Sequence, residues 1–110
     1  MPLEEIFYSD KKSKSQKQIT IRIIIIGRVQ NVGMRNWIKR KANQFDVNGW
    51  VRNRKADDTV EALFQGNEED VIEILQLCYN GPSFAHVKRI KEFPLKEEGI
   101  SKGFFILPSV

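Results

Sequence analysis

Alternate positions from residue 19 to residue 25 are all isoleucine, whereas the positions between them begin polar and then become apolar. A period of two is typical of a strand that packs one face on a core. The pattern predicts a central strand over residues 19–26, packed by helices on one face and only partly covered on the other.

Two later segments carry apolar residues at the spacing of an amphipathic helix. The first runs over residues 36–45 with basic residues turned outward, and the second follows Asn67, which we predict as its N-cap, and ends before Gly81-Pro82. Three acidic residues fill the first turn of the second helix. The predicted buried stripes are Met34, Trp37, Ile38, Ala42 and Phe45 in the first helix, and Val71, Ile74 or Leu75, Cys78 and Tyr79 in the second.

Four more segments read as strands: residues 47–54, 60–66, 84–93 and 103–107. The first two form a predicted hairpin because the gap between them is short, with Asn48-Gly49 as a turn into it. The resulting order is strand, helix, strand, strand, helix, strand, with one small extra strand. This order predicts an α+β fold, a ferredoxin-like βαββαβ sandwich with a mixed, mainly antiparallel sheet and two helices on one face.

The 110 residues are enough for one domain, which we place at residues 19–110. Residues 1–18 have no apolar periodicity and hold four lysines against three acids, so we predict a flexible basic N-terminal tail. The rest of the chain holds fourteen basic and eleven acidic residues. This excess is too small for a dedicated nucleic-acid binder, so no such partner is expected.

No apolar run approaches the length of a membrane span, and Glu4 and Glu5 disagree with a secretory signal. The single cysteine cannot form an internal disulfide. We therefore expect a cytoplasmic protein without a membrane partner, and a domain of this size is often a monomer.

The residue content excludes several kinds of catalytic site. One histidine, His86, and one cysteine, Cys78, rule out a His/Cys metal cluster and disfavour a Cys-His or Ser-His-Asp system. We expect His86 to be structural or exposed and Cys78 to be a small core residue. The carboxylate pairs Asp57-Asp58 and Glu97-Glu98 fall in predicted loops, and the Gly-Lys-Ser/Thr phosphate loop is absent.

One stretch favours an anion site. Residues 27–35 read Gly-Arg-Val-Gln-Asn-Val-Gly-Met-Arg, between the first strand and the first helix. Unpaired N–H groups and the positive helix end suit an oxyanion there, and Arg35 adds a planar fork of donors. Asn53, near the end of the second strand, can hold a water in line with a phosphorus atom. The residues alone leave open that Arg35 makes a structural ion pair and that Asn53 caps a turn.

These motifs resemble those of the acylphosphatases. Residues 27–35 are similar to the family's first signature, Gly-Arg-Val-Gln-Gly-Val, two residues, then Arg. The family's second signature resembles Gly49-Trp50-Val51-Arg52-Asn53, and the continuation of that signature resembles Val60-Glu61-Ala62 to Gly66. A later segment of the family resembles Gly81-Pro82 with Ala85 and Val87. The likeness covers about residues 19–107.

The resemblance implies a hydrolase that cleaves the carboxyl-phosphate bond of a small-molecule acyl phosphate, without metal or cofactor. It implies that backbone N–H groups of Arg28, Val29, Gln30, Asn31 and Val32 cradle the phosphate. Arg35 would bind the same phosphate and Asn53 would orient the attacking water. The substrate's own phosphate would help to take the proton.

The chain departs from the family pattern in two places. Asn31 stands where the family usually has glycine. If φ is positive there, asparagine is the least costly replacement for glycine. The hairpin after Asn53 lacks the usual glycine and is one residue longer. Two alternatives follow: a catalytically impaired anion-binding module, motivated by Asn31, and an RNA-binding module of the same fold, against which stands the lack of an aromatic-rich strand.

Overall fold

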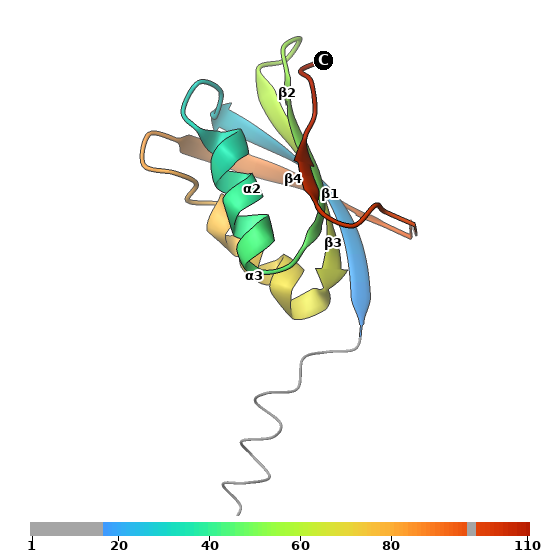
Figure 1. Cartoon of the computed structure of the whole chain (residues 1–110). Coiled ribbons are helices and arrows are strands. Elements are labelled where there is room, and N and C mark those ends of the chain that lie inside the picture. The colour runs from blue at the N-terminus through green and yellow to red at the C-terminus, as the bar shows by residue number, and fades with distance from the viewer. Residues whose placement is uncertain (1–16, 97–98) are drawn as a thin grey trace, which may run out of the picture.

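The computed structural model describes residues 17–96 and 99–110, and the elements follow the predicted order (Figure 1). They are β1 (Gln18–Arg28), α2 (Met34–Gln44), β2 (Asn48–Arg54), β3 (Thr59–Asn67), α3 (Glu68–Cys78), β4 (His86–Leu95) and β5 (Phe104–Ile106). The predicted tail falls mostly outside the described residues, as do Glu97 and Glu98. Within the described part, no helix is long and apolar enough to cross a membrane.

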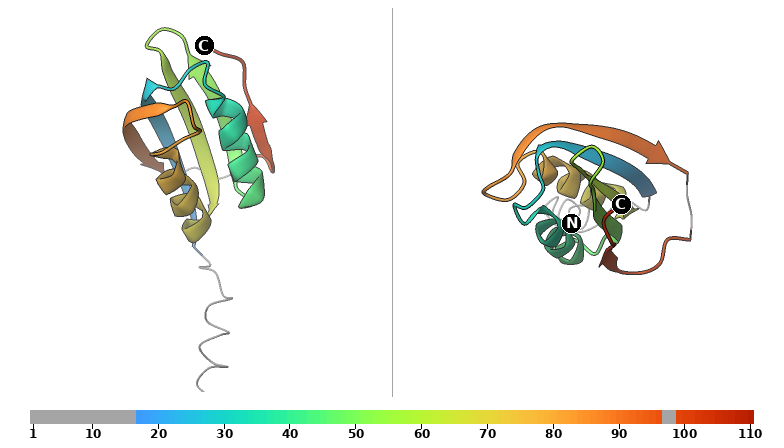
Figure 2. Two further views of the ribbon diagram at one scale, coloured as in Figure 1. Left: turned by 90° about the vertical axis from the view of Figure 1, so that its left-hand side faces the viewer. Right: turned by 90° about the horizontal axis from the view of Figure 1, so that it is seen from above.

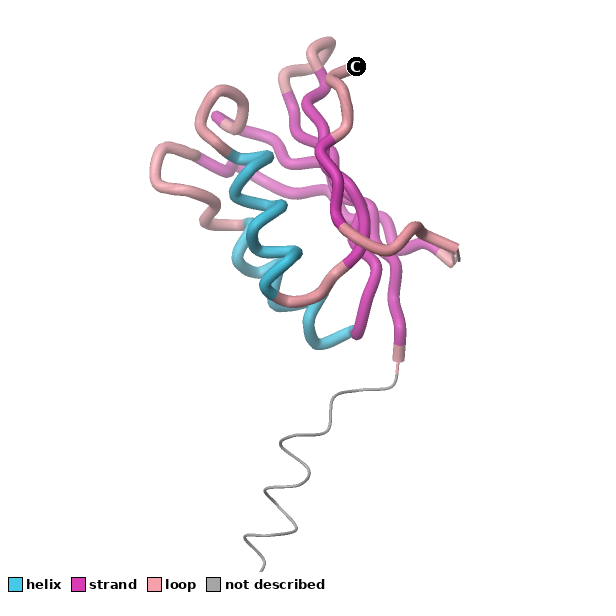
Figure 3. Tube along the Cα trace, viewed as in Figure 1, coloured by secondary structure: helices cyan, strands magenta, loops and turns pink. Residues whose placement is uncertain are grey.

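The strands form one sheet in the order β4-β1-β3-β2-β5. All neighbours pair antiparallel except β2 and β5, which are parallel. Both helices lie on the same face of this sheet (Figures 2 and 3). The predicted ferredoxin-like sandwich is thereby confirmed.

The core lies between the sheet and the two helices, where the period-two pattern of β1 meets the helical stripes. From β1 it takes Ile21, Ile23 and Ile25, from α2 Met34, Ile38 and Ala42, and from α3 Val71, Ile74 and Cys78. Trp37, Phe45 and Leu75 are partly buried against it. Tyr79 was wrongly placed in the stripe, since its side chain is 47% exposed and its hydroxyl donates to the Glu92 carboxylate at 2.8 Å.

Several boundaries differ from the predicted ones for local reasons. Asn48-Gly49 is not a turn, because both residues lie in β2 and pair with β3 at Gln65 and Phe64. β1 extends beyond its apolar pattern to Arg28 because β4 pairs with it up to that residue. β4 begins two residues later than predicted, at His86, which pairs with Arg28.

Asn67 stands at the N-cap of α3, as predicted, but its side chain makes no capping hydrogen bond. Its amide oxygen instead accepts a hydrogen bond from the side-chain amide of Gln18 on the neighbouring strand. The side chain therefore joins β1 to β3 and leaves the first turn of α3 to its own acidic residues.

Candidate active site

The loop that follows β1 is shaped first by a close approach between β1 and β4. Gly27 has φ 139°, and a Cβ built on it would lie 2.2 Å from the backbone oxygen of His86. The pairing register of the two strands shifts between Ile26 and Gly27. Only glycine fits this position, so the point where the chain leaves the sheet is set by sterics.

Two left-handed residues then turn the chain into α2. Asn31 has φ 58° and Gly33 has φ 81°. Asparagine is among the residues that tolerate this region best after glycine, so its substitution for the family glycine matches the backbone there. The condition stated for Asn31 in the sequence analysis, a positive φ, is therefore met.

The first turn of α2 presents unpaired donors to this loop. The first helical hydrogen bond runs from Trp37 N–H to the Gly33 oxygen at 3.0 Å, so the N–H groups of residues 34–36 have no partner within the helix. The N-cap, Gly33, supplies no side chain, and no acidic residue lies in this turn. The positive end of α2 is thus left without a protein anion of its own.

A cavity of about 50 Å³ opens at this helix end. Its lining joins the loop, the first turn of α2 and the end of β2: Val29, Asn31, Gly33, Met34, Arg35, Asn36 and Asn53. Asn53 is 8% exposed and pairs with Val60 across the hairpin. Two residues separated by a whole helix in the sequence, Arg35 and Asn53, therefore face one small space.

The remaining predicted cradle residues do not line this cavity. Arg28, Gln30 and Val32, together with Asn31, line a second hollow of about 490 Å³. Ser83, Phe84 and His86 form its other wall. The structure thus brings Val29, Asn31, Arg35 and Asn53 together and places Arg28, Gln30 and Val32 beside them.

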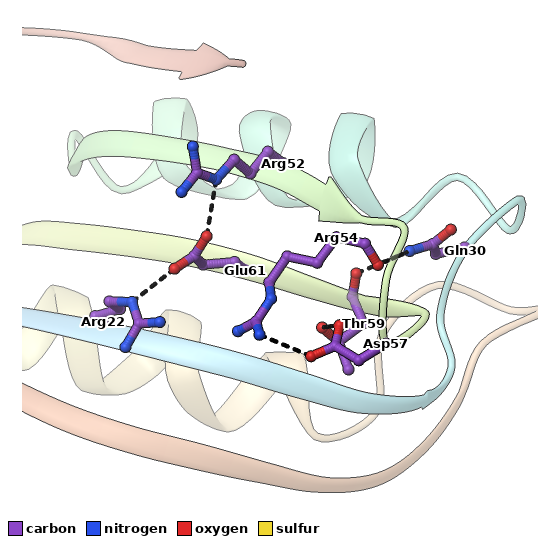
Figure 4. A network of polar contacts seen from close by, with 7 residues as sticks. All are labelled: Arg22, Gln30, Arg52, Arg54, Asp57, Thr59 and Glu61. Carbon is purple, nitrogen blue, oxygen red and sulfur yellow. Dashed lines mark hydrogen bonds and ion pairs between the residues drawn. The ribbon is translucent and has the colours of Figure 1, made fainter. Parts of the chain in front are cut away.

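Gln30 has a side-chain role that the sequence analysis missed. Its Nε2 donates to the backbone oxygens of Arg54 at 3.0 Å and Thr59 at 2.9 Å (Figure 4). These two residues are the paired ends of the β2–β3 hairpin, directly after Asn53. One side chain therefore ties the loop after β1 to the strand end that carries Asn53. The family resemblance predicts only a backbone N–H role for Gln30 and does not indicate these side-chain hydrogen bonds.

The hairpin without glycine closes by another route. Asp58 takes the left-handed conformation, with φ 59°. Asp57 accepts a hydrogen bond from the Thr59 hydroxyl at 2.7 Å and pairs with Arg54 at 2.7 Å (Figure 4). The Thr59 hydrogen bond, followed by the charge of Arg54, holds the pKa of Asp57 below its ordinary value despite some desolvation. The Asp57-Asp58 pair thus shapes the turn and lies outside the cavity.

Val110 supports the strand end from the other side. The backbone N–H of Val110 donates to the backbone oxygen of Asn53 at 3.0 Å. The backbone oxygen of Val110 accepts from the backbone N–H of Lys55 at 2.7 Å. These bonds continue the edge of β2 past β5, so the backbone oxygen of Asn53 is paired on that edge, while Val60 lies opposite Asn53 on the other. Nothing in the local sequence pattern of residues 108–110 indicated this contact.

Among the described residues, the cavity lining contains one cation, amides and apolar groups, without a carboxylate, imidazole or thiol. Cys78 is buried in the core and does not line the cavity, and burial raises the pKa of its thiol to about 12, so the thiol is unreactive. His86 is exposed on β4. Such a site can bind and orient an oxyanion and a water, but offers no side chain as a general base.

Comparisons with known proteins find similar chains of one family. The family model described as acylphosphatase matches residues 21–106. An acylphosphatase of Nitrobacter winogradskyi is 47% identical over 78 residues, which are 71% of this chain and 78% of that protein. One of Azorhizobium caulinodans is 40% identical over 91 residues, 83% of this chain and 97% of that protein. The crystal structure of acylphosphatase from Bacillus subtilis superposes with a TM-score of 0.77 at 32% identity, covering 81% of this chain and 98% of that one.

Proposed function

The chain belongs to the acylphosphatase family, and we propose that Arg35, Asn53 and the 28–32 loop carry out its hydrolysis of acyl phosphates. The reaction cleaves the bond between the acyl oxygen and phosphorus of a small-molecule substrate. Water adds to phosphorus, the carboxylate leaves with the bonding electrons, and inorganic phosphate is released.

The phosphate is held by backbone N–H groups of residues 28–32, by the start of α2 and by Arg35. The support is the open first turn of α2, which has no side-chain cap and no acidic residue. A dianionic phosphate supplies the negative charge that this end lacks. Arg35 adds paired donors that strengthen as charge builds on the equatorial oxygens during transfer.

Asn53 orients the attacking water. Its amide can donate and accept at once, and it lines the same cavity as Arg35. Since no acidic or imidazole side chain lines that cavity, the water's proton passes to a phosphate oxygen of the substrate. Phosphoryl transfer asks mainly for positioning and charge stabilisation, and this site supplies both.

The observation that carries this assignment is the shared cavity of Arg35 and Asn53 at the open end of α2. The acyl group extends away from this cavity, and we propose that the enzyme acts as a monomer. The Gln30 bridge acts on this reaction by holding the loop and the Asn53 strand end in register.

The test is acetyl phosphate hydrolysis by the purified protein beside Arg35→Ala and Asn53→Ala. Each loss of a positioned group should lower kcat/KM on the order of a hundredfold or more. Arg40→Ala and Asn43→Ala are matched controls, since both residues are exposed on α2 and outside the cavity lining. Both controls should hydrolyse the substrate like the parent.

Equal activity of Arg35→Ala and the parent would refute the assigned role of Arg35, and the same holds for Asn53. A folded parent that binds inorganic phosphate without turnover would identify the anion-binding alternative. In that case Asn31→Gly would locate the fault if it restored hydrolysis.

A further inference from the structure

The face of the sheet opposite the helices carries a row of aromatic residues drawn from three strands. Residues paired directly across strands share a face. Arg22 pairs with Phe93 and Leu63, and Trp50 pairs with Leu63 and Phe105, so these five residues form one row across the sheet. Phe93 is 38% exposed and Phe105 48%, and both helices lie on the other face (Figure 2). We call this surface the open face.

Arginine planes lie against two of these rings. The guanidinium carbon of Arg22 is 5.0 Å from the Phe93 ring centroid, and that of Arg52 is 4.9 Å from the Trp50 centroid. Both are cation–π distances, and a guanidinium plane is itself a surface on which a nucleobase stacks. The row is therefore a layered platform of rings and guanidinium groups.

Glu61 holds the two arginines in place. Its carboxylate accepts from Arg22 Nε at 2.6 Å and from Arg52 Nε at 2.8 Å (Figure 4). Burial favours the neutral acid, but these two hydrogen bonds outweigh it and lower the pKa of Glu61. Because Nε makes both bonds, the terminal nitrogens of each guanidinium stay available for phosphate oxygens or base edges.

Cations exceed anions on the open face. Arg54 stands two residues from Arg52 on β2, Lys91 pairs with Ile24, and Arg89 pairs with Ile26, so all three share the face with Arg22 and Arg52. Against these five cations stand two carboxylates among the described residues, Glu61 and the Asp57 that pairs with Arg54. Among the residues that the structure describes, no carboxylate forms an ion pair with Arg89 or Lys91.

We propose that the open face binds single-stranded polynucleotide, with bases stacked on Phe105 and on the guanidinium-covered rings of Trp50 and Phe93, and with phosphates held by Arg89 and Lys91. Aromatic platforms beside a positive surface are the recognised chemistry for unstacked bases with a charged backbone. A polyanion without bases would contact only the positive charges of the open face and not its aromatic rings. A second copy of the chain would bring a second positive face against the first, and the two would repel each other. The sequence hid this row because its aromatics are spread over residues 50, 93 and 105, one in each of three strands.

The experiment measures fluorescence anisotropy of a labelled oligouridylate of about 20 nucleotides, at about 50 mM and 200 mM salt, with an oligodeoxythymidylate as second probe. The parent should bind both, more weakly at the higher salt. Binding of both probes points to a single-stranded backbone with stacked bases, and preference for RNA would add recognition of the 2′-hydroxyl.

Matched pairs of variants separate stacking from charge. Phe105→Ser and Phe93→Ser should each weaken binding by about tenfold, whereas Phe84→Ser, an aromatic that is 77% exposed but outside the open face, should not. Arg89→Gln with Lys91→Gln should flatten the salt slope by about 1.4, the value for two single-strand phosphates. Lys39→Gln with Arg40→Gln on α2 removes the same charge and should leave the slope unchanged.

All open-face variants should keep acetyl phosphate hydrolysis, which shows that they are folded and separates this proposal from the active-site assignment. The proposal is overturned if the folded parent binds neither probe. It is also overturned if inorganic polyphosphate competes as well as the oligonucleotide, or if the control variants lose binding equally. Sedimentation that shows a dimer broken by Phe105→Ser, with no effect on the probe, would assign the face to a second copy instead.

Discussion

The two helices begin at opposite ends of the sheet, and their first turns are built in opposite ways (Figure 1). α3 carries Glu68, Glu69 and Asp70 in its first turn, whereas α2 carries no acid there and has Arg35 instead. Neither N-cap side chain bonds to its helix. Both helix ends are positive by the same backbone dipole, so the side chains alone decide which of them stays open to an external anion.

The comparison sets a helix end that acidic side chains of its own first turn stabilise beside one that has no such side chains. At α3 the helix end is satisfied from within, and Lys17 further pairs with Glu68 at 3.5 Å. At α2 the same interaction is withheld, and repulsion between Arg35 and the helix dipole adds to the cost. That unsatisfied end is what a phosphate can stabilise.

Of the variants that test this comparison between the helix ends, the largest effect is expected from one that gives α2 the acidic character of α3. Asn36→Asp places a carboxylate in the first turn and in the cavity lining. Repulsion of the bound phosphate, about 2 kcal/mol at a partly exposed site, should lower kcat/KM roughly thirtyfold. The same charge favours the helix end, so the melting temperature should rise slightly. Steady-state kinetics and thermal unfolding measure the two effects.

Asn43→Asp is the control, because it adds the same charge near the other end of α2. It should leave kcat/KM unchanged and lower stability slightly. If Asn36→Asp lost no activity, the open end of α2 would not be where the phosphate binds.

The next effect tests the bridge between the loop and the hairpin. Gln30→Ala removes both hydrogen bonds to the hairpin and should lower kcat about tenfold with a smaller change in KM, because Asn53 and the loop lose their register. In an Asn53→Ala background the same change should have little further effect. Initial rates over a range of acetyl phosphate concentrations separate kcat from KM.

Gln76→Ala, an exposed glutamine of α3, is the matched control and should change neither constant. Full additivity of Gln30→Ala and Asn53→Ala would contradict a positioning role for Gln30.

A smaller effect concerns the backbone that leads into α2. Asn31→Ala should lower the free energy of unfolding by about 1 kcal/mol, since alanine resists the left-handed region that Asn31 occupies at φ 58°. Asn31→Gly should match or exceed the parent in stability and retain hydrolysis. Urea titration measures the free energy of unfolding of both variants. An Asn31→Ala variant as stable as the parent would show that the loop relaxes to another conformation.

The smallest effect comes from the α3 end. Glu69→Gln removes one of three acids and should lower stability by about 0.5 kcal/mol at neutral pH, with kcat/KM unchanged. Urea unfolding at two salt concentrations checks the electrostatic origin. A loss of activity here would break the separation between the two helix ends.

Local sequence patterns were most informative where one element carried its own signal. The isoleucine alternation of β1 and the helical stripes that include Ala42 and Cys78 predicted the layers, because burial on one face requires that periodicity. Tyr79 followed the same spacing yet is exposed, since the helix ends at Cys78 and its side chain meets Glu92 on β4. The periodicity of one element cannot indicate which hydrogen-bond partner, such as Glu92, a distant strand places beside it.

The sequence by itself determined the βαββαβ order, the place of Arg35 at the start of the first helix, and the family motifs around Gly27 and Asn53. These are properties of neighbouring residues, and local sterics and charge are sufficient for them. Only the tertiary structure decided that Gln30 bridges to the hairpin, that Val110 pairs with Asn53, and that aromatics of three strands form one row. Such contacts depend on strand order and register, which join residues far apart in the chain and leave no periodic trace in either segment.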